Sequence, residues 1–249
     1  MAGHSKWAQI KHRKAVVDAR RGKLFAKLIR GIEIAARDAG TSNPANDMTL
    51  AAAVDRAKSY RVPAETIERA ARRGAGELGE NVAYERVTYE GYAPGGVAVL
   101  VEALTENRNR TGSEIRTTFN RAGASLGEPG SVAWMFDRRG LIVVGPGAAE
   151  EEVLAAAAEA GALDVRQQDE RWEVVTEARD LARVRGALGV AGLRIESADL
   201  TMLPSSTVSL DADGARPVLR LMDALEELDD VQGVYTNFDI PDEVLAEVS

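Results

Sequence analysis

LIVVGPGAAEEEVLAAAAEAGALDVRQQDERWEVVT, residues 141–176, decides the fold of this 249-residue chain, because it changes from strand to helix and back to strand within one short stretch. Together with the residues that follow, it predicts the strand–helix–strand–strand–helix–strand order of a ferredoxin-like unit. The predicted elements are strand 141–145, helix 149–160, strands 163–168 and 171–176, helix 178–189 and strand 193–202.

The residues on either side of this unit predict a second α/β domain. Two strands joined around Pro94-Gly95-Gly96 come before it, followed by a helix and a strand, and another helix and a last strand come after Pro204. The simplest topology therefore inserts the ferredoxin-like unit into a middle domain that the C-terminal segment completes. The elements expected for this domain are strands 84–92 and 97–104, helix 111–122, strand 131–136, helix 215–229 and strand 234–238.

The N-terminal part of the chain predicts a small three-helix domain. Apolar residues recur at three- and four-residue spacing over 19–39, and Gly40 is placed as the C-cap of that helix. A second helix is expected over 47–60 and a third after Pro63, whereas residues 1–17 show no clean period and predict an extended or mobile arm.

The predicted fold class is therefore α+β, with an N-terminal three-helix domain followed by two ferredoxin-like α/β domains, the second inserted into the first. The expected domains are a basic helical domain with its arm at 1–78, a middle α/β domain at 79–137 plus 204–249, and the inserted βαββαβ domain at 138–203.

Charge is distributed unevenly along the chain. Residues 1–76 hold 16 Lys and Arg against 7 Asp and Glu, although the whole protein carries a formal net charge of −8. Such an asymmetry favours a polyanion-binding module joined to an acidic body. The alternative is that the basic helices dock on the acidic remainder of the same chain.

Several function classes lack the residues that they need. The chain has no cysteine, and its two histidines, His4 and His12, have no partners to complete a metal set. No phosphate-binding GK[ST] motif and no plausible Ser/His/Asp set occurs, so we expect no enzyme, no metal, no cofactor and no small-molecule substrate. No apolar run approaches a bilayer span and no secretory signal is visible, which predicts a cytoplasmic protein without a membrane partner.

A cluster of cations at the start of the chain predicts a nucleic-acid-binding surface. Phosphate neutralisation requires several cations on one surface, and an exposed aromatic residue can stack on a base. Trp7 could instead pack the arm against the helical domain. The residues assigned to the contact strip are Lys6, Trp7, Lys11, His12, Arg13, Lys14, Arg20, Arg21, Lys23, Lys27 and Arg30.

A second cationic cluster lies in LTENRNRTGSEIR, where a strand passes into a helix. Arg108 and Arg110 are candidates for phosphate contact there, with Arg116 nearby and Thr111 or Asn109 as the expected N-cap. The alternative is that these arginines pair with acidic residues of a neighbouring domain.

Several motifs together resemble the YebC/PmpR family, which includes the mitochondrial translational activator of cytochrome c oxidase. The resemblance covers Gly3 to about Pro241 and implies three domains and a non-enzymatic role in gene expression, either as a DNA-binding transcriptional regulator or as a ribosome-associated factor that relieves stalling. The motifs are GHSKWAQIKHRKAVVDARRGKLFAKLIR, IERAARRGAGE, YEGYAPGGVAVLVEALTENRNRT, LGEPGSVAWMF and VYTNFDIP.

The leading hypothesis from the sequence is a nucleic-acid-binding regulator of gene expression whose partner is DNA, or ribosomal RNA and the ribosome. The second hypothesis is a protein–protein adaptor whose basic arm binds an acidic partner. The sequence leaves the oligomeric state open, a monomer included.

Overall fold

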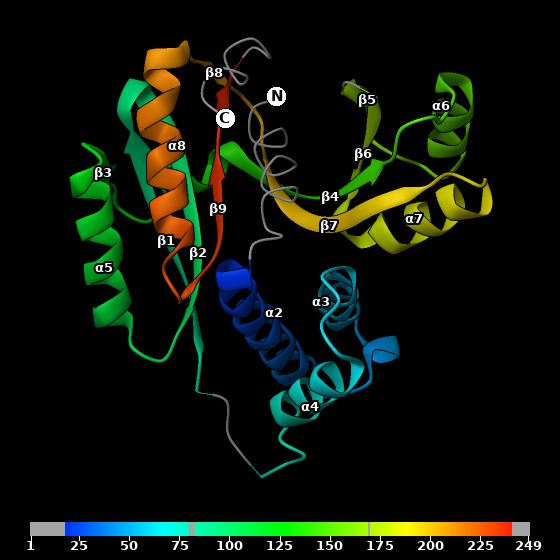
Figure 1. The fold of residues 1–249 in the computed structure, drawn as a ribbon, viewed down its shortest axis with the longest axis horizontal. Helices are drawn as coiled ribbons and strands as arrows, with labels where there is room; N and C mark the ends of the chain where they lie inside the picture. Colours follow the sequence, from blue (N-terminus) through cyan, green and yellow to red (C-terminus); the bar gives the residue numbers. More distant parts are fainter. Residues whose placement is uncertain (1–17, 80–82, 169, 241–249) are drawn as a thin grey trace.

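The computed structural model describes residues 18–79, 83–168 and 170–240, with side chains from residue 22 onward (Figure 1). It shows an N-terminal helical domain followed by two sheet-containing domains, so the α+β class is confirmed. No helix in this part of the chain is long and apolar enough to cross a membrane.

The helical domain consists of three helices around its own core. Ile32, Leu50 and Ala57 are fully buried in this core, as the three- and four-residue spacing predicts. Gly40 adopts φ +63° directly after the first helix, which confirms it as the residue that ends the helix. The elements are α2 (Asp18–Ala39), the 3-10 turn η1 (Pro44–Asn46), α3 (Met48–Ser59) and α4 (Ala64–Gly74).

The middle domain has a four-stranded sheet in the order β3-β1-β2-β9, with two helices on one face (Figure 1). Its central strand is buried on both sides: Val97, Val99 and Val101 face the helices, while Ala98 and Leu100 face the opposite side. The elements are β1 (Glu85–Ala93), η2 (Pro94–Gly96), β2 (Val97–Thr105), α5 (Arg108–Arg121), β3 (Ser125–Leu126), α8 (Ala212–Glu226) and β9 (Val231–Thr236), with the short parallel pair β8 (Val208–Ser209) and β10 (Phe238–Asp239) at one end.

The second sheet has the strand order β5-β6-β4-β7, with every neighbouring pair antiparallel. With one helix after its first strand and one after its third, this is the ferredoxin-like arrangement that the sequence predicts. Its elements are β4 (Phe136–Val144), α6 (Glu150–Glu159), β5 (Asp164–Gln168), β6 (Arg171–Glu177), η4 (Ala178–Asp180), α7 (Leu181–Val190) and β7 (Ile195–Pro204).

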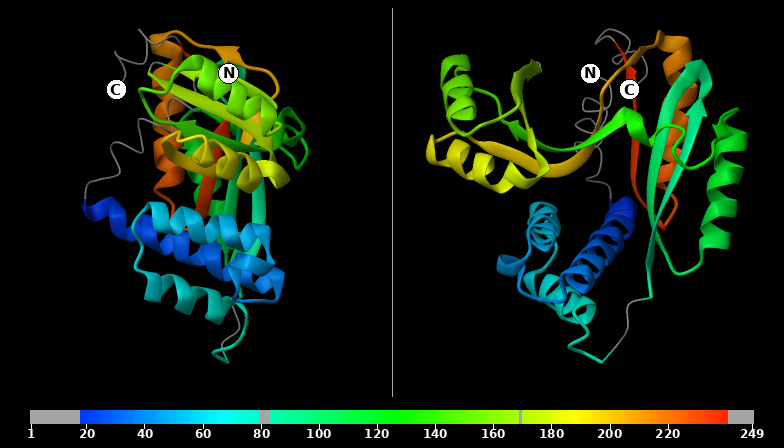
Figure 2. Two further views of the ribbon diagram at one scale, coloured as in Figure 1. Left: turned by 90° about the vertical axis from the view of Figure 1, so that its right-hand side faces the viewer. Right: turned by 180° about the vertical axis from the view of Figure 1, so that it is seen from behind.

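Strands β4 and β7 form a ribbon that joins the two sheets, as the right-hand view in Figure 2 shows. Pairing begins at Phe136 with Pro204 and continues to Val144 with Ile195. At the base of the ribbon, Phe136 and Val132 pack on Leu100 of the middle sheet. The expected bounds of the inserted domain, residues 138 and 203, fall within these two strands, and the division into domains stays a prediction.

The prediction of a strand over 131–136 is wrong. Residues Ala133–Met135 form a 3-10 turn, η3, and the third strand of the middle sheet is the two-residue β3. The amide groups of Val132 and Ala133 donate to the carboxylate of Glu90 instead of to a neighbouring strand. Because these donors are used by a side chain, the segment curls.

The helix predicted over 111–122 begins earlier than expected. Asn107 is the N-cap of α5, and its side chain accepts a hydrogen bond from the Arg110 amide at 3.1 Å. The expected caps, Thr111 and Asn109, therefore lie inside the helix. Thr111 is fully buried and uses its hydroxyl group in a network described below.

Candidate nucleic-acid interface

The structure leaves the first part of the predicted contact strip untested. Arg20 and Arg21 lie in α2, but their side chains are not described. Their role and that of the arm stay predictions. The arm residues that lie outside the described part of the chain are Lys6, Trp7, Lys11, His12, Arg13 and Lys14.

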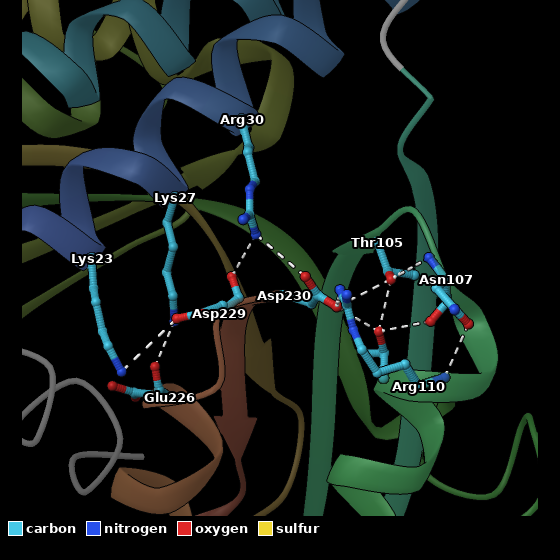
Figure 3. A network of polar contacts seen from close by, with 10 residues as sticks. Lys23, Lys27, Arg30, Thr105, Asn107, Arg110, Glu226, Asp229 and Asp230 are labelled. Carbon is cyan, nitrogen blue, oxygen red and sulfur yellow. Dashed lines mark hydrogen bonds and ion pairs between the residues drawn. The ribbon is translucent and has the colours of Figure 1, made fainter.

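Lys23, Lys27 and Arg30 form one row on α2, and Figure 3 shows all three pointing toward the turn between α8 and β9. We call residues 226–230, Glu-Glu-Leu-Asp-Asp, the acidic turn. The spacing of four and three residues places the three cations on the same face of the helix. The sequence prediction joined these residues correctly into one surface, but their contacts in this structure are within the chain.

Lys23 lies closest to the end of α8. Its ammonium group is 3.4 Å from the Glu227 carboxylate, 3.3 Å from the Glu227 carbonyl oxygen and 3.9 Å from the Asp229 carboxylate. Lys27 donates to the Glu226 carbonyl oxygen. Glu227 is the C-cap of α8, where the helix dipole is negative, so lysines are stabilised there by carbonyl groups and carboxylates together.

Arg30 connects α2 to the end of the acidic turn and to the start of the middle domain. Its guanidinium group donates to the Asp229 carbonyl oxygen at 2.8 Å and lies 3.4 Å from the Asp230 carboxylate. The same group lies 5.4 Å from the centre of the Tyr84 ring, within range of a cation–π interaction. Arg30 therefore contacts the body on two sides.

Asp230 is the centre of a buried network in the middle domain. Its carboxylate accepts hydrogen bonds from the Thr105 hydroxyl group at 3.1 Å and from the Arg110 guanidinium at 2.9 Å, both labelled in Figure 3. It also accepts one from the Thr111 hydroxyl group at 2.6 Å. Burial raises the pKa of Asp230, but the hydrogen bonds from Thr111, Arg110 and Thr105 outweigh it and lower the pKa below its ordinary value. The carboxylate is therefore held ionised.

Arg108 and Arg110, the second predicted cluster, have different surroundings in the structure. Arg110 is bound to Asp230, an acidic residue of the same middle domain. Arg108 is 67% exposed and lies 4.0 Å from the Glu85 carboxylate. Arg108 and Arg116 line an open cavity of about 570 Å³ between α5, β1 and residues 126–129. Their role in nucleic-acid binding stays a prediction.

The loop beside this cavity is fixed by a single buried carboxylate. Glu90 accepts three backbone hydrogen bonds of 2.7 Å each, from Gly130, Val132 and Ala133. Burial raises the pKa of Glu90, but these three hydrogen bonds outweigh it and lower the pKa. The loop ends at Trp134, whose side chain is 73% exposed.

The structure also brings together residues that the sequence analysis did not single out. Asp55 of α3 is 2.6 Å from Arg185 of α7, and Arg56 is 3.7 Å from Asp199 of β7. These pairs join the helical domain to the inserted domain. They are separated by more than a hundred residues, and nothing in the local spacing of the chain indicates them.

The described residues contain no cluster of three or more His, Cys, Asp or Glu placed to hold a metal ion. Fold and contacts together define a three-part α+β protein in which a basic helical domain is attached by ion pairs to two sheet-containing domains.

The chain belongs to the TACO1/YebC family. The N-terminal domain of that family matches residues 5–77, and its second and third domains match residues 84–238. A protein of Acidothermus cellulolyticus is 56% identical over 249 residues and one of Thermobifida fusca is 55% identical over 250 residues, each over the full length of both chains. Both are named probable transcriptional regulatory protein.

A solved structure has the same fold. The crystal structure of a conserved hypothetical protein from Aquifex aeolicus superimposes with a TM-score of 0.84 at 50% sequence identity. The match covers 96% of this chain and 99% of the other.

Proposed function

We propose that this protein is a cytoplasmic, non-catalytic regulator of gene expression that binds the phosphate backbone of nucleic acid through its basic helical domain. The names of its relatives support a regulatory role in transcription. The uneven charge supports nucleic acid as the partner, because 16 of the 31 Lys and Arg lie within the first 76 residues.

The observation that carries the proposal is the row formed by Lys23, Lys27 and Arg30. These residues span about 10 Å along the helix, since each residue advances the helix by about 1.5 Å. Three nucleotides of one strand rise by a similar distance, about 3.4 Å each. In the structure the row donates to a carboxylate of Glu227 and to the backbone carbonyl oxygens of Glu226 and Asp229, so its donors are already directed toward oxygen acceptors.

The described helices favour sequence-tolerant binding over base readout. The best candidate for a recognition helix, α4, offers Arg69, Arg72 and Arg73 and neither Asn nor Gln. Each of these arginines is paired with a glutamate of the helical domain or of the segment after it, respectively Glu65, Glu77 and Glu33. Without Asn or Gln, α4 offers no side chain suited to adenine, and the phosphate contacts that we assign to the arm and α2 serve DNA or structured RNA alike.

Reversing the charge of the arm tests the proposal. We expect K11E/R13E/K14E to weaken nucleic-acid binding strongly and to flatten its salt dependence. Each lost phosphate contact lowers the slope of log K against log salt concentration by about 0.7–0.9 in magnitude. The matched control is R121E/R179E/R194E, which makes the same charge change at exposed positions of the body. Equal loss in both variants, or no loss in the first, would refute the arm as part of the proposed surface.

Two measurements separate the possible partners. Crosslinking in cells, followed by sequencing of the bound nucleic acid, assigns the protein to translation if ribosomal RNA is recovered and to transcription if promoter DNA is recovered. The adaptor hypothesis predicts that complexes survive ribonuclease and deoxyribonuclease treatment before sedimentation.

A further inference from the structure

We propose that the acidic turn is an internal competitor of nucleic acid: it covers the phosphate-binding row of α2, and nucleic acid displaces it and releases the helical domain from the body. This inference rests on the proposed function and adds a mechanism that regulates the same surface.

The first observation is chemical. The acidic turn presents to the row what a nucleic-acid backbone would present, a short series of anionic and carbonyl oxygens spaced along a chain. Lys23 contacts Glu227 and Asp229, and Arg30 contacts Asp229 and Asp230. A cation bound to the turn cannot bind phosphate with the same hydrogen atoms, so the two ligands exclude each other.

The second observation is that the contact between the helical domain and the body is polar. In the described part of the chain, each hydrophobic cluster belongs either to the helical domain or to the body, and none contains residues of both. The contacts at α3, Asp55 with Arg185 and Arg56 with Asp199, are also ion pairs. Apart from Arg30 with Asp230, the ion pairs named here are partly exposed, so salt weakens them, and no shared hydrophobic core has to open when the domains separate.

The third observation is that the carboxylates of the acidic turn differ in their surroundings. Asp230 is bound to Thr105, Thr111 and Arg110 and has a structural role of its own. Glu227 and Asp229 are half-exposed or more, and their carboxylates face Lys23. The substitutions E227Q/D229N therefore remove the two carboxylate charges that face Lys23 and leave Asp230 and the buried network in place.

The binding experiment compares E227Q/D229N with a variant of equal charge. E151Q/E159Q removes two exposed acidic residues from α6, in the inserted domain. We expect the turn variant to bind a short single-stranded RNA, and a duplex DNA of the same length, about threefold to tenfold more tightly than the wild type, since two exposed ion pairs no longer compete. We expect the control variant to change affinity by less than about twofold, through long-range charge alone.

A distance measurement tests the release directly. The chain has no cysteine, so E68C/N120C gives one dye site on α4 and one on α5, both exposed. Addition of RNA should lower energy transfer in this labelled protein, and salt in the absence of RNA should lower it as well. The turn variant should show lower energy transfer than the control variant before any RNA is added.

The outcomes separate the inference from the proposed function. If the turn variant binds no more tightly than the control, or if RNA leaves energy transfer unchanged, the competitor role is overturned, while sensitivity of binding to K11E/R13E/K14E still upholds the proposed function. If neither the wild type nor the turn variant binds nucleic acid, both are overturned. Tighter binding by the turn variant together with loss of energy transfer supports both.

Discussion

Replacement of Asp230 tests how much of the stability of the middle domain depends on one carboxylate. Its side chain is 5% exposed and holds the end of β2, the start of α5 and the start of β9 together. The two hydrogen bonds from threonine hydroxyls contribute about 1.5 kcal/mol each, since the acceptor is charged. The Arg110 guanidinium reaches solvent and the Arg30 contact is a longer one of 3.4 Å, so the two arginines add only a small further contribution.

We therefore expect D230A to lower the free energy of unfolding by about 3–4 kcal/mol. D230N should lose about half as much, because its amide oxygen can still accept hydrogen bonds from Thr105 and Thr111 while the charge is lost. Urea unfolding, with hydrogen exchange at amides of β2 and α5 to report the middle domain separately, measures both values. The control D229N, at an exposed position of the same turn, should lose less than about 0.5 kcal/mol.

The same carboxylate predicts a dependence on pH. Because the pKa of Asp230 is lower in the folded protein, its ionised form stabilises the fold fully at any pH above the ordinary aspartate pKa of about 3.9. This contribution to the free energy of unfolding is lost as the pH falls through the lower pKa of the folded state. The difference in stability between wild type and D230N should shrink over that range. A D230A protein within about 0.5 kcal/mol of wild type at neutral pH, or a difference that grows in acid, would contradict this account of the network.

Further predictions concern the loop and the helical domain. E90Q should lower the free energy of unfolding by about 2–3 kcal/mol, because three backbone amide groups lose a charged acceptor. The fluorescence of Trp134 should change as the loop becomes more mobile. An unchanged urea midpoint would argue against the role of Glu90. G74A should lower the melting temperature of the helical domain by an amount equivalent to about 1–3 kcal/mol, since a Cβ atom there would lie 2.1 Å from the Glu33 carbonyl oxygen. In the matched change G31A, in α2, the added Cβ atom would meet no other atom within 4 Å, so the free energy of unfolding should rise by about 0.5–1 kcal/mol. Equal effects in both variants would refute the steric argument.

Elements with a clear local pattern could be predicted from the sequence, and elements that depend on a distant side chain could not. The ferredoxin-like order follows from short-range periodicity, and the structure confirms it. The segment at 131–136 has the composition of a strand, but Glu90, some forty residues earlier, takes its amide groups. A single sequence contains no signal for such a contact.

The candidate site shows the same limit. The sequence correctly groups Lys23, Lys27 and Arg30 on one helix face, because helical spacing is local. Their partners in the acidic turn lie about two hundred residues away, and only the overall charge asymmetry hints at them. For these three residues the alternative expectation, docking on the acidic remainder, is confirmed, and their contact with nucleic acid stays a prediction.

The ribbon of β4 and β7 makes the inserted domain removable in principle. Because Phe136 and Pro204 are paired across the ribbon, the chain leaves the middle domain and returns to it at neighbouring points, about 5 Å apart. A tight two-residue turn could close that gap, so the middle domain has no need of the insert to complete its sheet. The protein can thus be considered as a two-domain chain with an attachment point, at which a domain can be exchanged, lengthened or deleted while the sheet beneath it keeps its strand order.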